Sequence, residues 1–89
     1  MPESSETRTA TLPEGVALHA RPAASMVREA AKHAPAITLH ANGKKADAKS
    51  ILQVLALGAE GGSRVEVVTT GSGASGALDV IAGLLETLE

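Results

Sequence analysis

Two segments of the chain carry apolar residues at intervals of three and four, the spacing that places them on one face of a helix. In the first segment, from residue 20 to residue 33, the apolar positions are Ala23, Met26, Val27, Ala30 and Ala34 just beyond it. In the C-terminal segment they are Leu78, Ile81, Ala82, Leu85 and Leu88. Pro22 fits the first turn of the earlier helix and Pro35 stops it, because proline lacks the N–H that a helix interior needs.

Alternation with a period of two predicts four strands between and around these helices. The first strand is rich in threonine and the last in valine, both β-branched residues. The expected strands are residues 7–12, 37–41, 44–48 and 64–70. Asn42-Gly43 joins the middle two, and this dipeptide favours the tight type I′ hairpin. Two glycine-rich connectors, residues 59–63 and 71–76, complete the pattern.

A short third helix is predicted after the hairpin. Ser50 is a typical N-cap, and Gln53 three residues later completes a capping box. The helix runs to about Leu57, and Gly58 supplies the usual C′ residue. The element order is therefore β-α-β-β-α-β-α, which predicts a two-layer α+β domain with all helices on one face of a sheet. We expect residues 1–5 to form a flexible tail and residues 6–89 to form this single domain.

Composition excludes several classes of function. The chain has 89 residues, no cysteine, no aromatic residue and a net charge of −2. Disulfide and thiol chemistry are excluded, and base stacking on aromatic side chains is not available. The charge favours neither nucleic acid nor an anionic membrane. The N-terminal residues have no signal-peptide pattern and no apolar run is long enough to span a bilayer, so we expect a cytoplasmic protein without membrane insertion.

His19 is the candidate for chemistry, because it stands where the first helix is expected to begin. A helix N-terminus offers unpaired backbone N–H groups and a partial positive charge, which favour an anion. A histidine there can carry a phosphoryl group on a ring nitrogen, with the Arg21 guanidinium beside it. The same position also suits an ordinary capping or surface histidine, and Arg21 alone can be a plain surface charge. His33 and His40 lack a metal-ligand pattern, so no metal is expected.

Several separated motifs resemble one known family. They are Leu18-His19-Ala20-Arg21-Pro22-Ala23, Asn42-Gly43-Lys44, Ala48-Lys49-Ser50-Ile51, Leu57-Gly58 and Gly61. From about Thr7 to Leu88 the chain is similar to HPr, the histidine-containing phosphocarrier of the bacterial phosphoenolpyruvate-dependent sugar phosphotransferase system. The resemblance implies an open-faced β-sandwich, a four-stranded antiparallel sheet with three helices on one face. It also implies a stoichiometric carrier, not a stand-alone enzyme, without a cofactor.

The resemblance assigns a role to each site residue. It implies that His19 carries the phosphoryl group on Nδ1, that Arg21 neutralises it, and that the backbone of Ala20 and Arg21 binds it. Ser50 matches a serine that a regulatory kinase modifies in some members. The implied docking residues are Ala20, Lys49, Ile51, Leu52 and Leu55. The family usually has glycine at position 17, often after a polar residue, where this chain has Ala17 and Val16.

The implied partners are enzyme I as phosphoryl donor and sugar-specific enzyme IIA domains as acceptors. A serine kinase or phosphatase and regulatory proteins are further possible partners. The protein is expected to be a monomer. Two alternatives share the fold: a regulatory paralogue that signals by its phosphorylation state, and a carrier in a nitrogen-related or dihydroxyacetone relay. A hydrolase with His19 as general base is a third, and no second catalytic group accompanies it. The short helix at residues 51–57 is apolar on nearly all sides, which indicates either unusual burial or an exposed docking patch.

Overall fold

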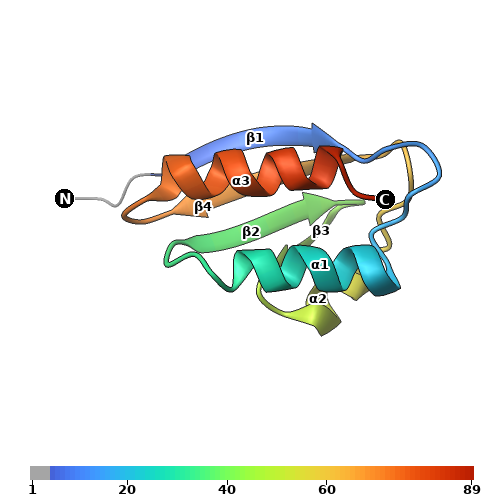
Figure 1. The fold of residues 1–89 in the computed structure, drawn as a ribbon, viewed down its shortest axis with the longest axis horizontal. Coiled ribbons are helices and arrows are strands. Elements are labelled where there is room, and N and C mark those ends of the chain that lie inside the picture. The colour runs from blue at the N-terminus through green and yellow to red at the C-terminus, as the bar shows by residue number, and fades with distance from the viewer. Residues whose placement is uncertain (1–4) are drawn as a thin grey trace.

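The computed structural model describes residues 5–89, which form one sheet covered on one face by three helices (Figure 1). The elements are β1 (Ser5–Thr11), α1 (Ala20–Ala30), β2 (Ala36–Ala41), β3 (Lys44–Asp47), α2 (Ile51–Ala56), β4 (Arg64–Thr70) and α3 (Ala74–Glu86). The sheet is antiparallel throughout, with strand order β1-β4-β2-β3. The predicted element order and the open-faced two-layer architecture are confirmed.

The register of the sheet explains the alternation in the sequence. Residues that lie opposite each other on paired strands share a face. Val67 on β4 lies opposite Leu39 on β2, which lies opposite Ala46 on β3, and all three are buried under the helices. The neighbouring row on the other face contains Thr7, Val68, Thr38 and Asp47, and none of these is fully buried.

The core is built from aliphatic side chains and methionine, as a chain without aromatic residues requires. The largest side chains that are fully buried are Leu12, Leu18, Met26, Ile37, Leu39, Leu57, Ile81, Leu85, Val54, Val65, Val67 and Thr69. The hydroxyl of Thr69 donates a 2.8 Å hydrogen bond to the carbonyl of Ala74, so this buried polar group is satisfied. Leu18 belongs to this core and immediately precedes His19, which anchors the candidate site to the body of the domain.

Three element boundaries differ from the predicted ones by more than one residue. Strand β1 begins at Ser5, which pairs with Thr70, so Ser5 does not belong to the expected tail; the rest of that tail, residues 1–4, lies outside the described residues. Helix α1 ends at Ala30 and continues only as a turn, in which the amides of Lys32 and His33 donate to carbonyls three residues back, at 3.1 Å each. Helix α3 begins at Ala74, inside the predicted connector, since Gly73 adopts a left-handed conformation as its N-cap.

The capping box at α2 is only half formed. The Ser50 hydroxyl accepts from the Gln53 amide at 3.4 Å, as predicted. The Gln53 side-chain oxygen, however, accepts from the amide of Asp47 at 2.8 Å. The Ser50 amide cannot be its partner because it already donates to the Asp47 carbonyl at 3.0 Å. The cap therefore ties α2 to the end of β3. None of the helices within residues 5–89 has the length and apolar character that crossing a bilayer requires.

Candidate functional site

His19 is the N-cap residue of α1 and its side chain is exposed. Its backbone is extended, with φ −143° and ψ 156°, and its ring makes no capping hydrogen bond to the helix. Both ring nitrogens therefore remain available for other chemistry. The residues around it are held firmly, because Leu18 and Ala23 are both buried in the core. The fold thus presents an exposed imidazole next to a backbone that is anchored in the core.

The start of α1 leaves backbone donors beside this ring. The first hydrogen bond of the helix runs from the Ala23 amide to the His19 carbonyl, at 3.4 Å. The amides of Ala20 and Arg21 precede it and have no acceptor inside the helix, while Pro22 has no N–H. Ala20 has φ +44°, a conformation that is uncommon for a residue other than glycine and is found disproportionately at functional sites. Two N–H groups and the positive end of the helix dipole therefore lie next to His19.

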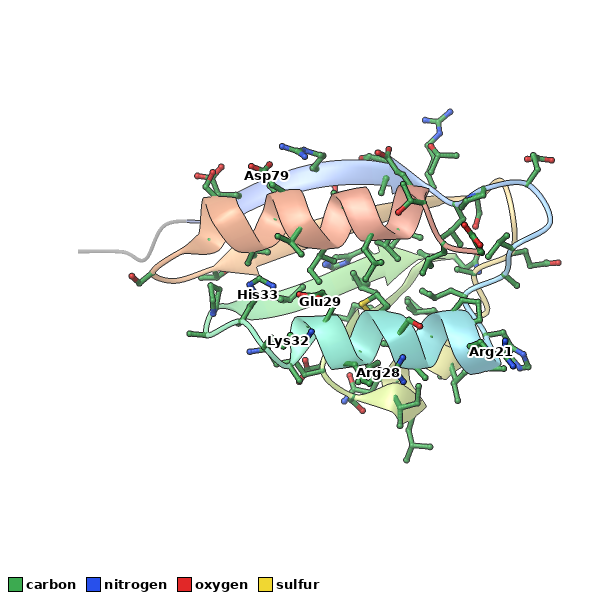
Figure 2. The ribbon with its side chains drawn as sticks, viewed as in Figure 1. Arg21, Arg28, Glu29, Lys32, His33 and Asp79 are labelled. Atoms are coloured by element: carbon green, nitrogen blue, oxygen red, sulfur yellow. The ribbon has the colours of Figure 1, made fainter. Side chains whose placement is uncertain are left out.

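Arg21 lies at the same end of α1 and is exposed. Figure 2 shows its side chain at the tip of the helix, at the opposite end from Glu29, Lys32 and His33. No carboxylate within residues 5–89 forms an ion pair with Arg21. The structure therefore places His19, the first amides of α1 and Arg21 at one end of the helix, with no carboxylate of the described residues paired to the guanidinium.

The loop before His19 is held from behind. The Leu18 amide donates to the Ala59 carbonyl at 2.8 Å, and the His19 amide donates to the Ala17 carbonyl at 2.9 Å. Val16 is partly buried and packs against the hydrophobic core. An apolar residue at this position is thus explained by packing.

The exposed apolar surface of α2 is narrower than the sequence allows. Val54 and Leu57 are buried, and Leu55 is half-buried against the core. Ile51 and Leu52 are exposed, with relative accessibilities of 38% and 77%. The helix therefore has one buried side and, facing solvent, a small apolar patch that consists of Ile51 and Leu52.

Lys49 is not brought to His19. Its ammonium group donates to the His33 carbonyl at 2.6 Å, just beyond the C-terminal end of α1. Because an α-helix rises 1.5 Å per residue, the 11 residues of α1 separate its two ends by about 16 Å. Among the residues predicted for the site, Lys49 and Ser50 therefore form a second region, distinct from the surroundings of His19.

The comparison with known families identifies the family of this chain. The family model described as "PTS HPr component phosphorylation site" matches residues 6–87. The chain belongs to the HPr family. The phosphocarrier protein HPr of Mycoplasma capricolum is 36% identical over 73 residues, covering 82% of each chain. A multiphosphoryl transfer protein of Haemophilus influenzae is 37% identical over 73 residues, which are 79% of this chain and 15% of that protein.

Solved structures of HPr proteins agree with the fold. The crystal structure of a phosphocarrier protein HPr from Bacillus anthracis is 31% identical and superposes with a TM-score of 0.88, covering 93% of this chain and 99% of that one. The resemblance and the fold class are thus both confirmed. The chain is an HPr-type phosphocarrier of the phosphotransferase system.

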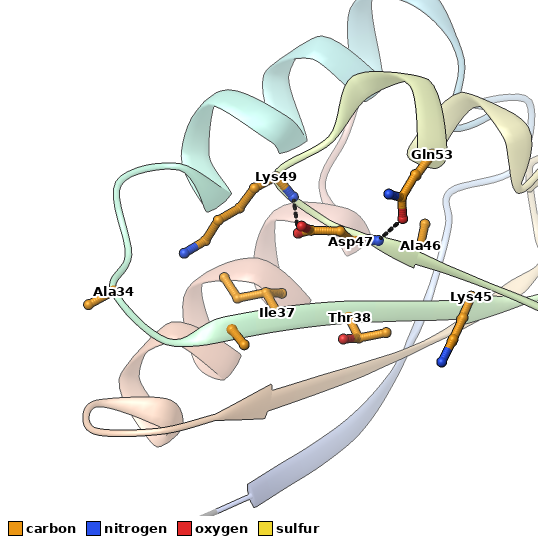
Figure 3. Close-up of a pocket in the computed structure, with 9 residues that line it drawn as sticks. Ala34, Ile37, Thr38, Lys45, Ala46, Asp47, Lys49 and Gln53 are labelled. Carbon is orange, nitrogen blue, oxygen red and sulfur yellow. Dashed lines mark hydrogen bonds between the residues drawn. The ribbon is translucent and has the colours of Figure 1, made fainter.

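One cleft lies away from His19. It has a volume of about 520 Å³ and lies between β2, β3 and the start of α2. Figure 3 shows Asp47, Lys49 and Gln53 at its wall, with the Asp47 carboxylate accepting from the Lys49 amide at 2.9 Å. Within residues 5–89 no cluster of histidine, aspartate or glutamate is arranged to hold a metal ion.

One contact in this HPr-family chain was not foreseen from the sequence. The side-chain amide of Asn42 donates to the carbonyls of Leu57 and Gly58, at 2.9 and 3.1 Å. It thereby fastens the β2–β3 hairpin to the end of α2 and to the loop whose Ala59 carbonyl holds Leu18. The Asn-Gly pair signals the turn, but no local pattern signals this contact, because its partners are 15 and 16 residues away.

Proposed function

We propose that His19 is the residue that accepts and donates the phosphoryl group, through Nδ1. The observation that carries this proposal is its position as the exposed N-cap of α1, next to two amides without helical acceptors and beside Arg21. The lone pair of the neutral imidazole attacks the phosphorus of a donor phosphohistidine. The new N–P bond forms as the donor's N–P bond breaks, and the electron pair returns to the donor ring. No redox change occurs, and the second transfer reverses the roles.

Charge neutralisation at this site is moderate, which suits a carrier. The helix N-terminus stabilises an anion by about 0.3–1 kcal/mol at an exposed position. The Arg21 guanidinium can donate two parallel hydrogen bonds to phosphate oxygens. Because the site is open to water, these interactions stabilise phosphohistidine without trapping it. In-line geometry and further neutralisation come from the partner when the two proteins dock.

The partners of this transfer are enzyme I as donor and sugar-specific enzyme IIA domains as acceptors. Ile51 and Leu52 supply exposed apolar surface for docking, and Ala20 lies beside the reactive ring. The exposed part of the Leu55 side chain adds to this docking surface, and Lys49 adds a positive charge at the other end of α1. The protein acts as a cytoplasmic monomer and binds each partner in turn.

Ser50 is the candidate for regulation by a kinase and phosphatase. A phosphate there adds a charge of about −1.5 to −2 beside the exposed Ile51 and Leu52. This charge opposes any acidic partner surface that approaches α2. Ser50 also caps the helix, so its hydroxyl has a structural role whether or not it is modified.

The test is incubation with phosphoenolpyruvate and enzyme I, followed by measurement of acid-labile phosphate on the protein. We expect one phosphoryl group per chain, and none in His19→Ala. His40→Ala is the matched control, because it removes a histidine of the sheet and should leave labelling unchanged. Label that survives His19→Ala, or an unlabelled wild-type protein, would contradict the proposal.

A further inference from the structure

The loop that leads to His19 is packed along a second, glycine-containing loop. The Leu12 amide donates to the Ser63 carbonyl at 2.9 Å, and the Leu18 amide donates to the Ala59 carbonyl at 2.8 Å. The two segments therefore run antiparallel, one from residue 12 to residue 18 and the other from residue 63 back to residue 59. Between these two hydrogen bonds, the backbone approaches at Gly61.

Gly61 is in closer contact with this loop than any residue with a side chain could be. A Cβ atom at Gly61 would lie 2.5 Å from the amide nitrogen of Gly15, 2.7 Å from that of Val16 and 3.0 Å from the carbonyl oxygen of Pro13. These atoms belong to one turn, in which the Val16 amide donates to the Pro13 carbonyl at 3.1 Å. All three are backbone atoms, so no side-chain rotation can relieve the contact.

Glycine is required at position 61 because there is no room for a Cβ atom. The φ angle of Gly61 is not in the left-handed region, unlike that of its neighbour Gly62, at +81°. At Gly62 the nearest group is the flexible carboxylate of Glu14, which can move aside. A substitution at Gly61 therefore tests the distance between the two loops and little else.

We infer that Gly61 is a positioning residue for phosphoryl transfer: its missing side chain lets the turn at residues 13–16 close onto the second loop and so sets the backbone that carries His19. This inference rests on the proposed role of His19. Val16 is two residues before Leu18, and Gly61 is two residues after Ala59, so the contact at Gly61 and the Leu18–Ala59 hydrogen bond are adjacent steps of one antiparallel pairing. Displacing the contact at Gly61 therefore strains the Leu18–Ala59 hydrogen bond, and His19 directly follows Leu18.

The size of the effect follows from the distances. Ordinary van der Waals contact begins at 3.4 Å, so a methyl group at Gly61 requires the Gly15 nitrogen to retreat by about 0.9 Å, the difference from 2.5 Å. A misplacement of about 1 Å in a reacting group can lower a rate about 100-fold. Since the exposed apolar residues of α2 are not in this contact, we expect docking to change little. We expect Gly61→Ala to lower kcat for phosphorylation by enzyme I about 10- to 100-fold, with KM changed less than twofold.

Two glycine-to-alanine controls separate positioning from loss of stability. Gly76→Ala adds the same methyl group on α3, where nothing lies within 4 Å and φ is not left-handed. Gly73→Ala lies beside Pro35, beyond the end of α1 that is opposite His19, and has φ +83°, so it destabilises the fold through backbone strain away from the site. Both controls should keep wild-type kcat when the folded fraction is taken into account. The imidazole NMR signals of His33 and His40 serve as references, and only the His19 signal should shift in Gly61→Ala.

Each outcome decides the matter. If the wild-type protein is not phosphorylated, the proposed function is wrong. If the wild type is phosphorylated and Gly61→Ala matches Gly76→Ala in kcat and in the His19 NMR signal, only this inference is overturned. A rise in KM at constant kcat also overturns it, because it points to docking. If Gly61→Ala does not fold, the wild type is used: phosphorylation of His19 should change hydrogen exchange at the Gly61 amide more than at Gly76, and an equal response refutes the role.

Discussion

Replacing Leu52 with aspartate tests the docking surface at one position. Leu52 is the most exposed of the large apolar residues in the described chain, at 77%, and belongs to the first turn of α2. Leu55 is unsuitable for the same test, since it is half-buried against the core and a charge there would disturb the fold. The single substitution Leu52→Asp therefore isolates the partner surface.

The free energy of unfolding should change little in Leu52→Asp. Only about a quarter of the side chain is buried, so about 0.5 kcal/mol of hydrophobic stabilisation is lost out of the roughly 1.5–3 kcal/mol for full burial. The lower helix propensity of aspartate costs about another 0.5 kcal/mol. An acidic residue in the first turn, where α2 has none, restores about 0.3–1 kcal/mol. The net change is within about 1 kcal/mol.

The effect on docking should be larger. If a partner covers the exposed part of Leu52, it gains about 1–2 kcal/mol from that burial, which is 77% of the value for a whole leucine. Because about 1.4 kcal/mol corresponds to a factor of ten, loss of this term alone raises KM about 5- to 30-fold. Burying the new carboxylate adds to the loss. We expect KM for enzyme I to rise at least about tenfold with kcat nearly unchanged.

Steady-state phosphorylation by enzyme I, with the carrier concentration varied, measures this directly. Val80→Asp is the matched control: it places the same charge on an exposed apolar residue of α3, at 42% accessibility, and should leave KM unchanged. Both variants are first checked for folding by urea denaturation. A folded Leu52→Asp with wild-type KM would show that Leu52 is not in the interface, and an equal rise in both variants would indicate a nonspecific effect of charge.

Three further predictions concern stability and are measured by urea or thermal unfolding. Asn42→Asp keeps the turn preference but removes two hydrogen-bond donors and sets a carboxylate against two carbonyls, so it should cost about 2 kcal/mol; a neutral result would refute the fastening role of Asn42. Ser50→Ala should cost about 1 kcal/mol by removing the N-cap, whereas Ser50→Asp should be nearly neutral because aspartate also caps. Met26→Ala should cost about 2–5 kcal/mol by leaving a cavity under α1, and less than 1 kcal/mol would mean that the core collapses around it.

The parts of the fold that depend on local periodicity were predictable. Each of these parts is encoded by residues close together in the sequence. They are the alternating threonines and valines of the strands, the Asn42-Gly43 turn, and the apolar faces of α1 and α3. The predicted boundaries were wrong where strand pairing or the conformation of a glycine extends an element beyond its local sequence pattern. Ser5 joins β1 because Thr70 is available to pair with it, and α3 starts at Ala74 because Gly73 can adopt a left-handed cap.

The placement of the candidate site residues was predictable only in part. His19 and Arg21 share one helix end, so their spacing in the sequence is enough to bring them together. Lys49 is different: its ammonium is held by the His33 carbonyl, a contact across 16 residues. The Gln53 contact with Asp47 and the approach of Gly61 to Gly15 are likewise tertiary, and no periodic pattern encodes them.

These tertiary contacts share a consequence for how an exposed histidine can be selective. A reactive side chain in a pocket is oriented by the walls, but His19 has no wall, so only its backbone can orient it. That backbone is held by buried Leu18 before it, by the first turn of α1 after it, and by the loop of residues 59–63 behind it. The ring itself is exposed and makes no capping hydrogen bond to the helix. If His19 carries the phosphoryl group as proposed, a fixed backbone and an exposed ring let one histidine serve as acceptor for one protein and donor for another.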